Sequence, residues 1–217
     1  MKKIKFRSSK ISLLLATPRP ASKEIPEWYK ELDGVEDGLR TIKKCMPILD
    51  SMTAGYMLVL AADVHFKDGN FQEISKIAMI ETHDKKQIGE FYLPKEFFDQ
   101  PYKWLNYFLI ETPRGYSSLI MHPLNRLDLP FYTMTGIVDT DTFPVPVNLP
   151  FFIRKDFDGI IAEGTPIAQV IPFKRVDWKS EIDEKTQANA PISFLNNVLN
   201  PPFNFYKKAY WKRKKYQ

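Results

Sequence analysis

The chain has 217 residues, of which 44% are hydrophobic, 14% are aromatic and 26% are charged, and its formal net charge is +5. This aromatic content excludes a chain that is disordered as a whole, and the length is enough to bury a core without cross-links. The single cysteine, Cys45, cannot form an intrachain disulfide and is expected to be a small buried residue. The 17 prolines favour short strands joined by ordered loops over long helices.

The first 52 residues are expected to form a strand and short helices that pack on a core. The apolar run 11–16 is shorter than the core of a signal peptide and lacks a cleavage site, so it is predicted as a first strand. No apolar run approaches the roughly 20 residues that span a bilayer, so we expect a cytoplasmic protein without membrane contact. Short helices are predicted at 26–32, where Pro26 suits the first helical position, and at 41–51.

Residues 53–175 are expected to form a mainly β core. Asp68-Gly69-Asn70 is a turn signal between two apolar runs, which predicts a hairpin. Several short strands separated by Pro, Gly, Asn or Asp are typical of a sandwich or a barrel-like fold. The predicted strands cover 55–66, 71–81, 104–111, 116–121, 131–138, 145–153 and 167–175.

Residues 176–217 are expected to form an extension, with a short helix at 192–199 and a basic tail. Residues 201–217 hold six lysines and arginines and no acidic residue, and these cations interleave with Tyr206, Tyr210, Trp211 and Tyr216. Cations can meet phosphates while aromatic rings stack on bases, so residues 206–216 could contact nucleic acid or a protein partner. The alternative is a solvated tail, or one that docks on a neighbouring subunit.

Four motifs between residues 113 and 174 occur in an informative order. They are Pro113-Arg114-Gly115-Tyr116, Met121 to Arg126, Gly136 to Asp141, and Gly164 to Ile171. This order and spacing resembles the dUTPase and dCTP-deaminase superfamily. The resemblance implies a β-clip fold (a distorted barrel or sandwich), assembly as a homotrimer, and Asp139 as the aspartate that directs water and sugar. Ala62-Asp63 is the weakest match, to an early motif of that family.

The catalytic sets of this superfamily are incomplete in the chain. Asn125 or a neighbour stands where dUTPases place a serine, Thr142 stands where they place a tyrosine, and Leu149 stands where deaminases need a glutamate. The glycine-rich arm that closes over the triphosphate has no counterpart in the basic tail. The resemblance therefore supports the fold more than the activity.

The whole chain also resembles an uncharacterised family found in tailed-phage and bacterial genomes. The residues that carry this resemblance are 20–30, 43–55, 123–126, 136–141 and 167–175. The resemblance implies a phage origin, and hence a location in the host cytoplasm or association with the virion. It implies no activity.

Two functional hypotheses follow. The first is a catalytically degenerate dUTPase-like protein that acts as a structural, assembly or binding scaffold, leaning away from an enzyme. The second is a divergent nucleotide-binding protein or phosphohydrolase, in which Mg²⁺ is the only implied cofactor. In the second, Asp139 and Asp63 manage water and metal, while Asn125, Arg126 and Gln169 bind the ligand.

The same residues also have purely structural interpretations. Asp139 could be a turn carboxylate that accepts backbone N–H groups. Arg126 could simply pair with Asp128 or with a backbone carbonyl in its own loop.

Overall fold

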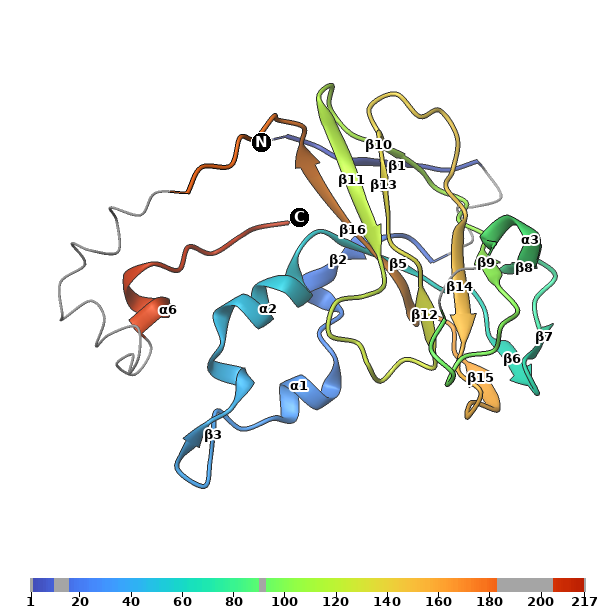
Figure 1. Cartoon of the computed structure of the whole chain (residues 1–217), viewed down its shortest axis with the longest axis horizontal. Helices are drawn as coiled ribbons and strands as arrows, with labels where there is room; N and C mark the ends of the chain where they lie inside the picture. Colours follow the sequence, from blue (N-terminus) through green and yellow to red (C-terminus); the bar gives the residue numbers. More distant parts are fainter. Residues whose placement is uncertain (1, 10–15, 90–92, 183–204, 217) are drawn as a thin grey trace.

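The computed structural model describes residues 2–9, 16–89, 93–182 and 205–216. Residues 11–15 of the expected first strand and the expected helix at 192–199 lie outside these ranges. Figure 1 shows the strands gathered into one body, with helices α1 (Glu27–Glu31) and α2 (Met46–Thr53) on one side of it. The chain is mainly β, which confirms the coarse prediction from the sequence.

A five-stranded antiparallel sheet holds the longest strand at its centre. Its order is β13 (Gly136–Val138), β11 (Tyr116–Met121), β16 (Pro166–Lys174), β5 (Tyr56–Val59) and β2 (Arg19–Pro20). The first five residues of β16 are buried, as expected for a strand covered on both faces. Pro172 lies beyond the last residue of β16 that pairs with β5, so its missing N–H is tolerated on that open side.

A four-stranded antiparallel sheet packs beside it. Its order is β12 (Phe131–Thr133), β14 (Leu149–Ile153), β9 (Tyr102–Trp104) and β8 (Ile80–Thr82). The rings of Trp104 and Phe151 stack with centroids 3.7 Å apart and planes 6° apart. The Trp104 indole N–H donates to the Thr133 hydroxyl over 3.1 Å, and this hydroxyl donates to the Ile167 carbonyl over 2.7 Å. A buried hydrogen-bonded chain therefore ties the two sheets together.

A third sheet contains the predicted hairpin. It comprises β15 (Gly159–Ile161), β6 (Val64–Lys67) and β7 (Asn70–Glu73). Asp68 and Gly69 connect β6 to β7 with φ of +49° and +74°, the left-handed pair that two-residue hairpins favour. The Tyr102 hydroxyl donates to the Gly69 carbonyl, which fixes this turn to the four-stranded sheet.

The remaining elements are short. Strand β1 (Lys5–Arg7) pairs with β10 (Leu109–Glu111), and β3 (Val35–Glu36) pairs with β4 (Leu39–Arg40). The other helices are α3 (Lys85–Ile88), α6 (Phe205–Ala209) and the 3₁₀ turns Ala21–Lys23 and Ile42–Lys44. No helix in the described part of the chain is long and apolar enough to cross a membrane.

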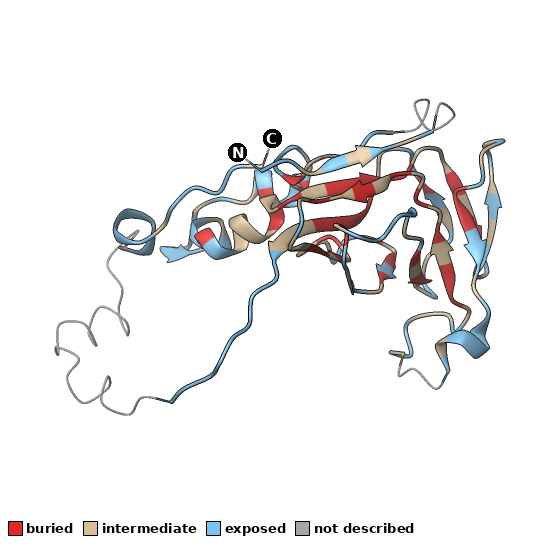
Figure 2. Ribbon diagram, turned by 90° about the horizontal axis from the view of Figure 1, so that it is seen from above, coloured by how far each residue is buried: buried red, intermediate tan, exposed pale blue. Residues whose placement is uncertain are grey.

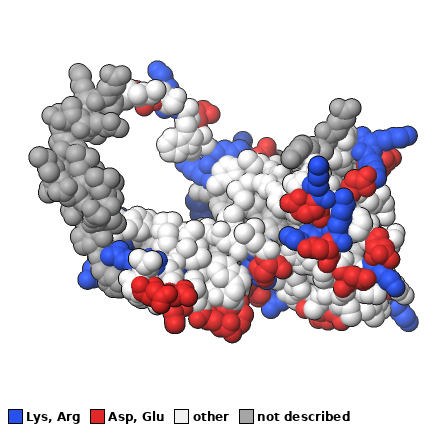
Figure 3. Space-filling model, turned by 60° about the horizontal axis from the view of Figure 1, so that its bottom comes forward, with Lys and Arg blue, Asp and Glu red and all other residues white. Residues whose placement is uncertain are grey.

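One hydrophobic core lies between the three larger sheets, and Figure 2 shows its buried residues concentrated on the central strands. Phe66, Trp104, Phe131, Phe151 and Val170 belong to it and are at most 2% exposed. Burying a large apolar side chain stabilises a fold by about 1.5–3 kcal/mol, so these residues dominate the packing energy. Most charged groups of the described residues lie at the surface, where Figure 3 shows acidic and basic side chains side by side around a broad uncharged area.

Several sequence-based expectations need correction. The expected strands 55–66, 71–81, 104–111 and 131–138 each divide into two strands that join different sheets: β5 and β6, β7 and β8, β9 and β10, and β12 and β13. The sheets of the described residues leave open edges rather than closing into a barrel. Cys45 is exposed, not buried, because it precedes α2 and caps the surface-facing turn before it.

Candidate functional site

The loop after β13 and the end of β16 meet through an ionic network. The antiparallel pairing of β11 with both strands brings residues 138 and 172 opposite Ser118, so the residues that follow each strand lie at the same edge. Arg175 donates to both oxygens of Asp141, over 2.8 and 2.5 Å, and to Asp139 over 3.1 Å. The described structure thus contains an arginine that holds two carboxylates of one loop.

Asp141 is the buried member of this network. Its side chain is 1% exposed, and it also accepts the backbone N–H of Gly115 over 2.7 Å. The hydrogen bonds from Arg175 and Gly115 lower the pKa of Asp141 to about 2. Hydrogen bonds to the charged form of a carboxyl favour that form, so Asp141 stays ionised and anchors the 139–143 loop at neutral pH.

Asp139 is the exposed member. Its side chain is 62% exposed, and its Oδ1 accepts the Ser117 hydroxyl over 2.6 Å as well as the Arg175 guanidinium. Its Oδ2 accepts no hydrogen bond from the described residues. An open groove of about 520 Å³ runs past it, lined by Ile137, Val138, Thr142, Phe143, Pro144 and Val147. A carboxylate beside an apolar groove can orient a polar group of a bound ligand.

Gln169 and Asn125 come together at the end of α2. Gln169 is fully buried, and its amide accepts from the Leu124 N–H over 2.9 Å and donates to the carbonyls of Ser51 and Ala54. Asn125, at a φ of +60°, donates to the Ser51 hydroxyl over 2.9 Å. The Gln169 amide thus serves as a clamp between three chain segments.

Arg126 pairs within its own loop. Its guanidinium donates to both oxygens of Asp128, over 2.9 and 2.8 Å, and its side chain is only 13% exposed. Burial is the largest single effect and raises the pKa of Asp128, but the hydrogen bonds and the positive charge of Arg126, with the hydrogen bonds from the Asp128 backbone and Trp28, together lower the net pKa. The sequence left this pairing open as the structural alternative, and it is the arrangement that the chain adopts.

His122 fastens the same loop to β12. Its Nδ1 accepts the Thr133 N–H over 3.3 Å, so the ring proton sits on Nε2 and is donated to the Arg126 carbonyl over 3.1 Å. Burial lowers the pKa of His122, which favours this neutral ring. The sequence analysis did not assign His122 any part in positioning Arg126.

Asp63 lies far from Asp139. Its Oδ1 accepts the N–H of Glu163, three residues before β16 begins, over 2.7 Å, whereas Asp139 contacts Arg175, the residue that follows β16. Nine residues of strand at about 3.3 Å each separate the two carboxylates by roughly 25–30 Å. One chain therefore does not bring Asp63 and Asp139 to a common metal or water.

Among the described residues, no group of three or more His, Cys, Asp or Glu side chains is arranged to hold a metal ion. Sequence reasoning missed Asp141 and Arg175, although both stand inside motifs that carry the family resemblances. The only sequence signal was that Asp141 follows Asp139 by two residues, while the partner that joins them is 34 residues further on. The contact between Asp141 and Arg175 depends on the register of the strands that precede them.

No family model matches the chain, and no curated protein matches it.

Proposed function

We propose that this protein is a phage-type scaffold protein with a β-clip-like body, which assembles into homo-oligomers rather than turning over a substrate. The family resemblances of the sequence favour a trimer. The engagement of Gln169, Arg126 and Arg175 with groups of the same chain supports a structural role for the polar residues of the site. The observation that carries the proposal is the open edge of the five-stranded sheet.

This edge is strand β13, which pairs with β11 on one side only. Its central residue, Ile137, is 66% exposed, and Phe143 and Val145 in the following loop are 44% and 49% exposed. Exposed edge strands are usually protected by charges or prolines, because an uncharged edge pairs with other chains. The three residues of β13 carry no charge, so this edge, with the exposed Phe143 and Val145 of the following loop, is suited to contact a second copy of the chain.

The Ile137→Lys variant tests this assembly. We expect the wild-type chain to sediment at about three times its 25.3 kDa mass, and the variant to shift toward the monomer, because a lysine cannot be buried unpaired at an interface. Analytical ultracentrifugation gives the mass, and circular dichroism checks that the fold is retained.

The matched control is Ile160→Lys, which changes an isoleucine that is 55% exposed in the edge strand β15 of another sheet. This control should keep the wild-type mass. A wild-type chain that stays monomeric at every concentration, or a control that dissociates as fully as Ile137→Lys, would contradict the proposal.

The exposed carboxylate of Asp139 beside its groove favours a second candidate function, binding of a nucleotide with Mg²⁺. In this candidate, Phe143 packs on the base or sugar and Asp139 orients a hydroxyl or a water. Asp63 takes no part in it within one chain.

A thermal-shift scan with nucleotides, with and without Mg²⁺, tests the candidate. A ligand at a concentration about 100 times its dissociation constant adds about 2.7 kcal/mol to the free energy of unfolding. For a chain of this length, this raises the unfolding midpoint by several degrees. Asp139→Asn should abolish the shift, whereas Asp158→Asn, a change of another exposed aspartate, should keep it. A flat response to every nucleotide would remove the candidate and leave the scaffold proposal standing.

A further inference from the structure

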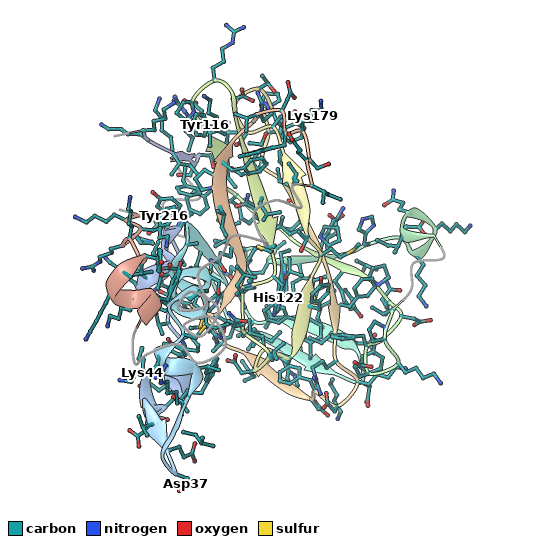
Figure 4. All side chains as sticks on the ribbon, turned by 60° about the vertical axis from the view of Figure 1, so that its left-hand side comes forward. Asp37, Lys44, Tyr116, His122, Lys179 and Tyr216 are labelled. Carbon is teal, nitrogen blue, oxygen red and sulfur yellow. The ribbon has the colours of Figure 1, made fainter. Side chains whose placement is uncertain are left out.

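The two described ends of the chain meet at a groove on the β body. The groove has a volume of about 400 Å³, and its lining includes Lys2 and Lys3 before β1, Lys215 and Tyr216 at the end of the tail, and Tyr56 and Tyr116. Figure 1 and Figure 2 both place the N and C ends close together. Figure 4 shows Tyr116 at the end of the long strands and Tyr216 on the C-terminal segment, and both line the groove. We call this feature the Lys–Tyr groove.

The tail is held in this place by specific contacts. The Trp211 indole N–H and the Lys214 ammonium both donate to Asp50, over 2.9 and 2.5 Å. The Tyr216 ring packs edge-to-face on Tyr56, with centroids 6.3 Å apart. These contacts dock the tail on α2 and β5, so the Lys–Tyr groove is part of the fold and not a chance approach of solvated ends.

The groove carries positive charge that its own carboxylates do not neutralise. Lys5 is paired with Glu111 and Lys214 with Asp50. No carboxylate of the described residues pairs with Lys2, Lys3 or Lys215. Lys212 and Arg213 continue the exposed basic strip away from the groove, so more than one phosphate can be met along it.

Aromatic rings stand among these cations. The Lys2 ammonium lies 4.3 Å from the centroid of the Tyr116 ring. The rings of Tyr56 and Tyr216 also line the groove. Alternating cations and aromatic rings are the elements with which proteins bind single strands, because cations follow the phosphates and every base has a face that stacks.

We propose that the Lys–Tyr groove binds single-stranded nucleic acid, with Lys2, Lys3 and Lys215 at phosphates and Tyr116 stacked on a base. The groove volume lies in the range of about 300–1,000 Å³ that holds drug-sized ligands, so it has room for about one nucleotide. The phosphates that follow this nucleotide contact the basic strip at 212–215. The site is separate from Asp139. Tyr116 and Ser117 point to opposite faces of β11, and Ser117 is the residue that contacts Asp139.

The test is a fluorescence-anisotropy titration of the full chain with labelled oligo(dT) and oligo(U). A variant with Lys2→Gln, Lys3→Gln and Lys215→Gln should bind at least 10-fold more weakly at low salt. The slope of log affinity against log salt should also fall by about 2, since three phosphate contacts contribute about 0.7 each on a single strand. Tyr116→Leu keeps the apolar bulk but removes the flat ring, and should weaken binding by about 5-fold or more.

The matched control changes Lys67, Lys76 and Lys86 to glutamine, three exposed lysines outside the groove and outside any ion pair of the described residues. This variant has the same net charge as the groove variant and should stay close to wild-type affinity. A preference for oligo(dT) or oligo(U) would identify DNA or RNA as the source of the strand.

Three results would overturn the proposal: no binding of either oligonucleotide by the wild type, equal losses in the control and groove variants, or unchanged affinity in Tyr116→Leu. Binding of vesicles with anionic lipid in place of oligonucleotides would overturn it too, and would assign the groove to a membrane surface.

Discussion

At the scale of single residues, similar side chains have different fates because their surroundings differ. Asp139 and Asp141 are two residues apart in one loop and share Arg175, yet one side chain is 62% exposed and the other 1%. The Gly115 N–H reaches only Asp141. The exposed carboxylate is therefore available to a ligand, while the buried one holds the loop.

The effect of Asp141 on stability should depend on pH. Its pKa in the folded chain is about 2, lowered from 3.8 by Arg175 and Gly115. A lowered pKa gives stability that is fully present above about pH 4 and is lost as the pH falls toward 2. Asp141→Asn should therefore lower the unfolding midpoint at pH 7, and the difference from wild type should shrink below pH 4.

Urea unfolding at several pH values measures this difference. Asp156→Asn is the control. Asp156 pairs with Arg154, but both side chains are exposed, that of Asp156 at 67% and that of Arg154 at 38%. Exposed pairs contribute little, so that variant should stay near wild type. If the difference in unfolding midpoint between Asp141→Asn and the wild type is the same at pH 7 and at pH 2, the role given to the lowered pKa of Asp141 is wrong.

At the scale of elements, β16 organises the molecule. It pairs with β11 and β5, is followed directly by the arginine of the ionic network, and carries Gln169 against α2. A buried amide in a central strand is costly unless each of its groups is paired. Gln169 meets this condition by bonding backbone groups of the α2 end and of the 121–126 loop.

Gln169→Leu should destabilise the chain by about 2–4 kcal/mol, because the Leu124 N–H and the carbonyls of Ser51 and Ala54 would lose their partner. Chemical denaturation measures the free energy of unfolding. Gln72→Leu, on the exposed side of β7, makes the same change without buried partners and should be nearly neutral. Equal effects in the two variants would show that the clamp contributes nothing specific.

At the scale of the whole molecule, the edge at β13 and the Lys–Tyr groove differ in composition. The two larger sheets have open edges at β13 and β12, and the apolar residues around β13 suit contact with another copy of the chain. The Lys–Tyr groove, by contrast, combines residues from the two ends of the chain. Oligomer formation and binding of a single strand are thus tested by different variants, and the failure of one leaves the other in place.

The sequence by itself determined the features that depend on neighbours along the chain. Short apolar runs and the turn residues between them predicted the β class, the bounds of β11 and the Asp68-Gly69 hairpin, since both are local properties of the sequence. Pro26 likewise predicted the start of α1.

Only the tertiary structure decided how distant residues combine. The pairing of Arg175 with Asp141, the clamp at Gln169, the 25–30 Å estimated between Asp63 and Asp139, and the meeting of Lys2 with Tyr116 all depend on strand register. The division of 131–138 between two sheets was decided in the same way. The local sequence pattern does not indicate strand register, because register is fixed by which side chains pack together in the core.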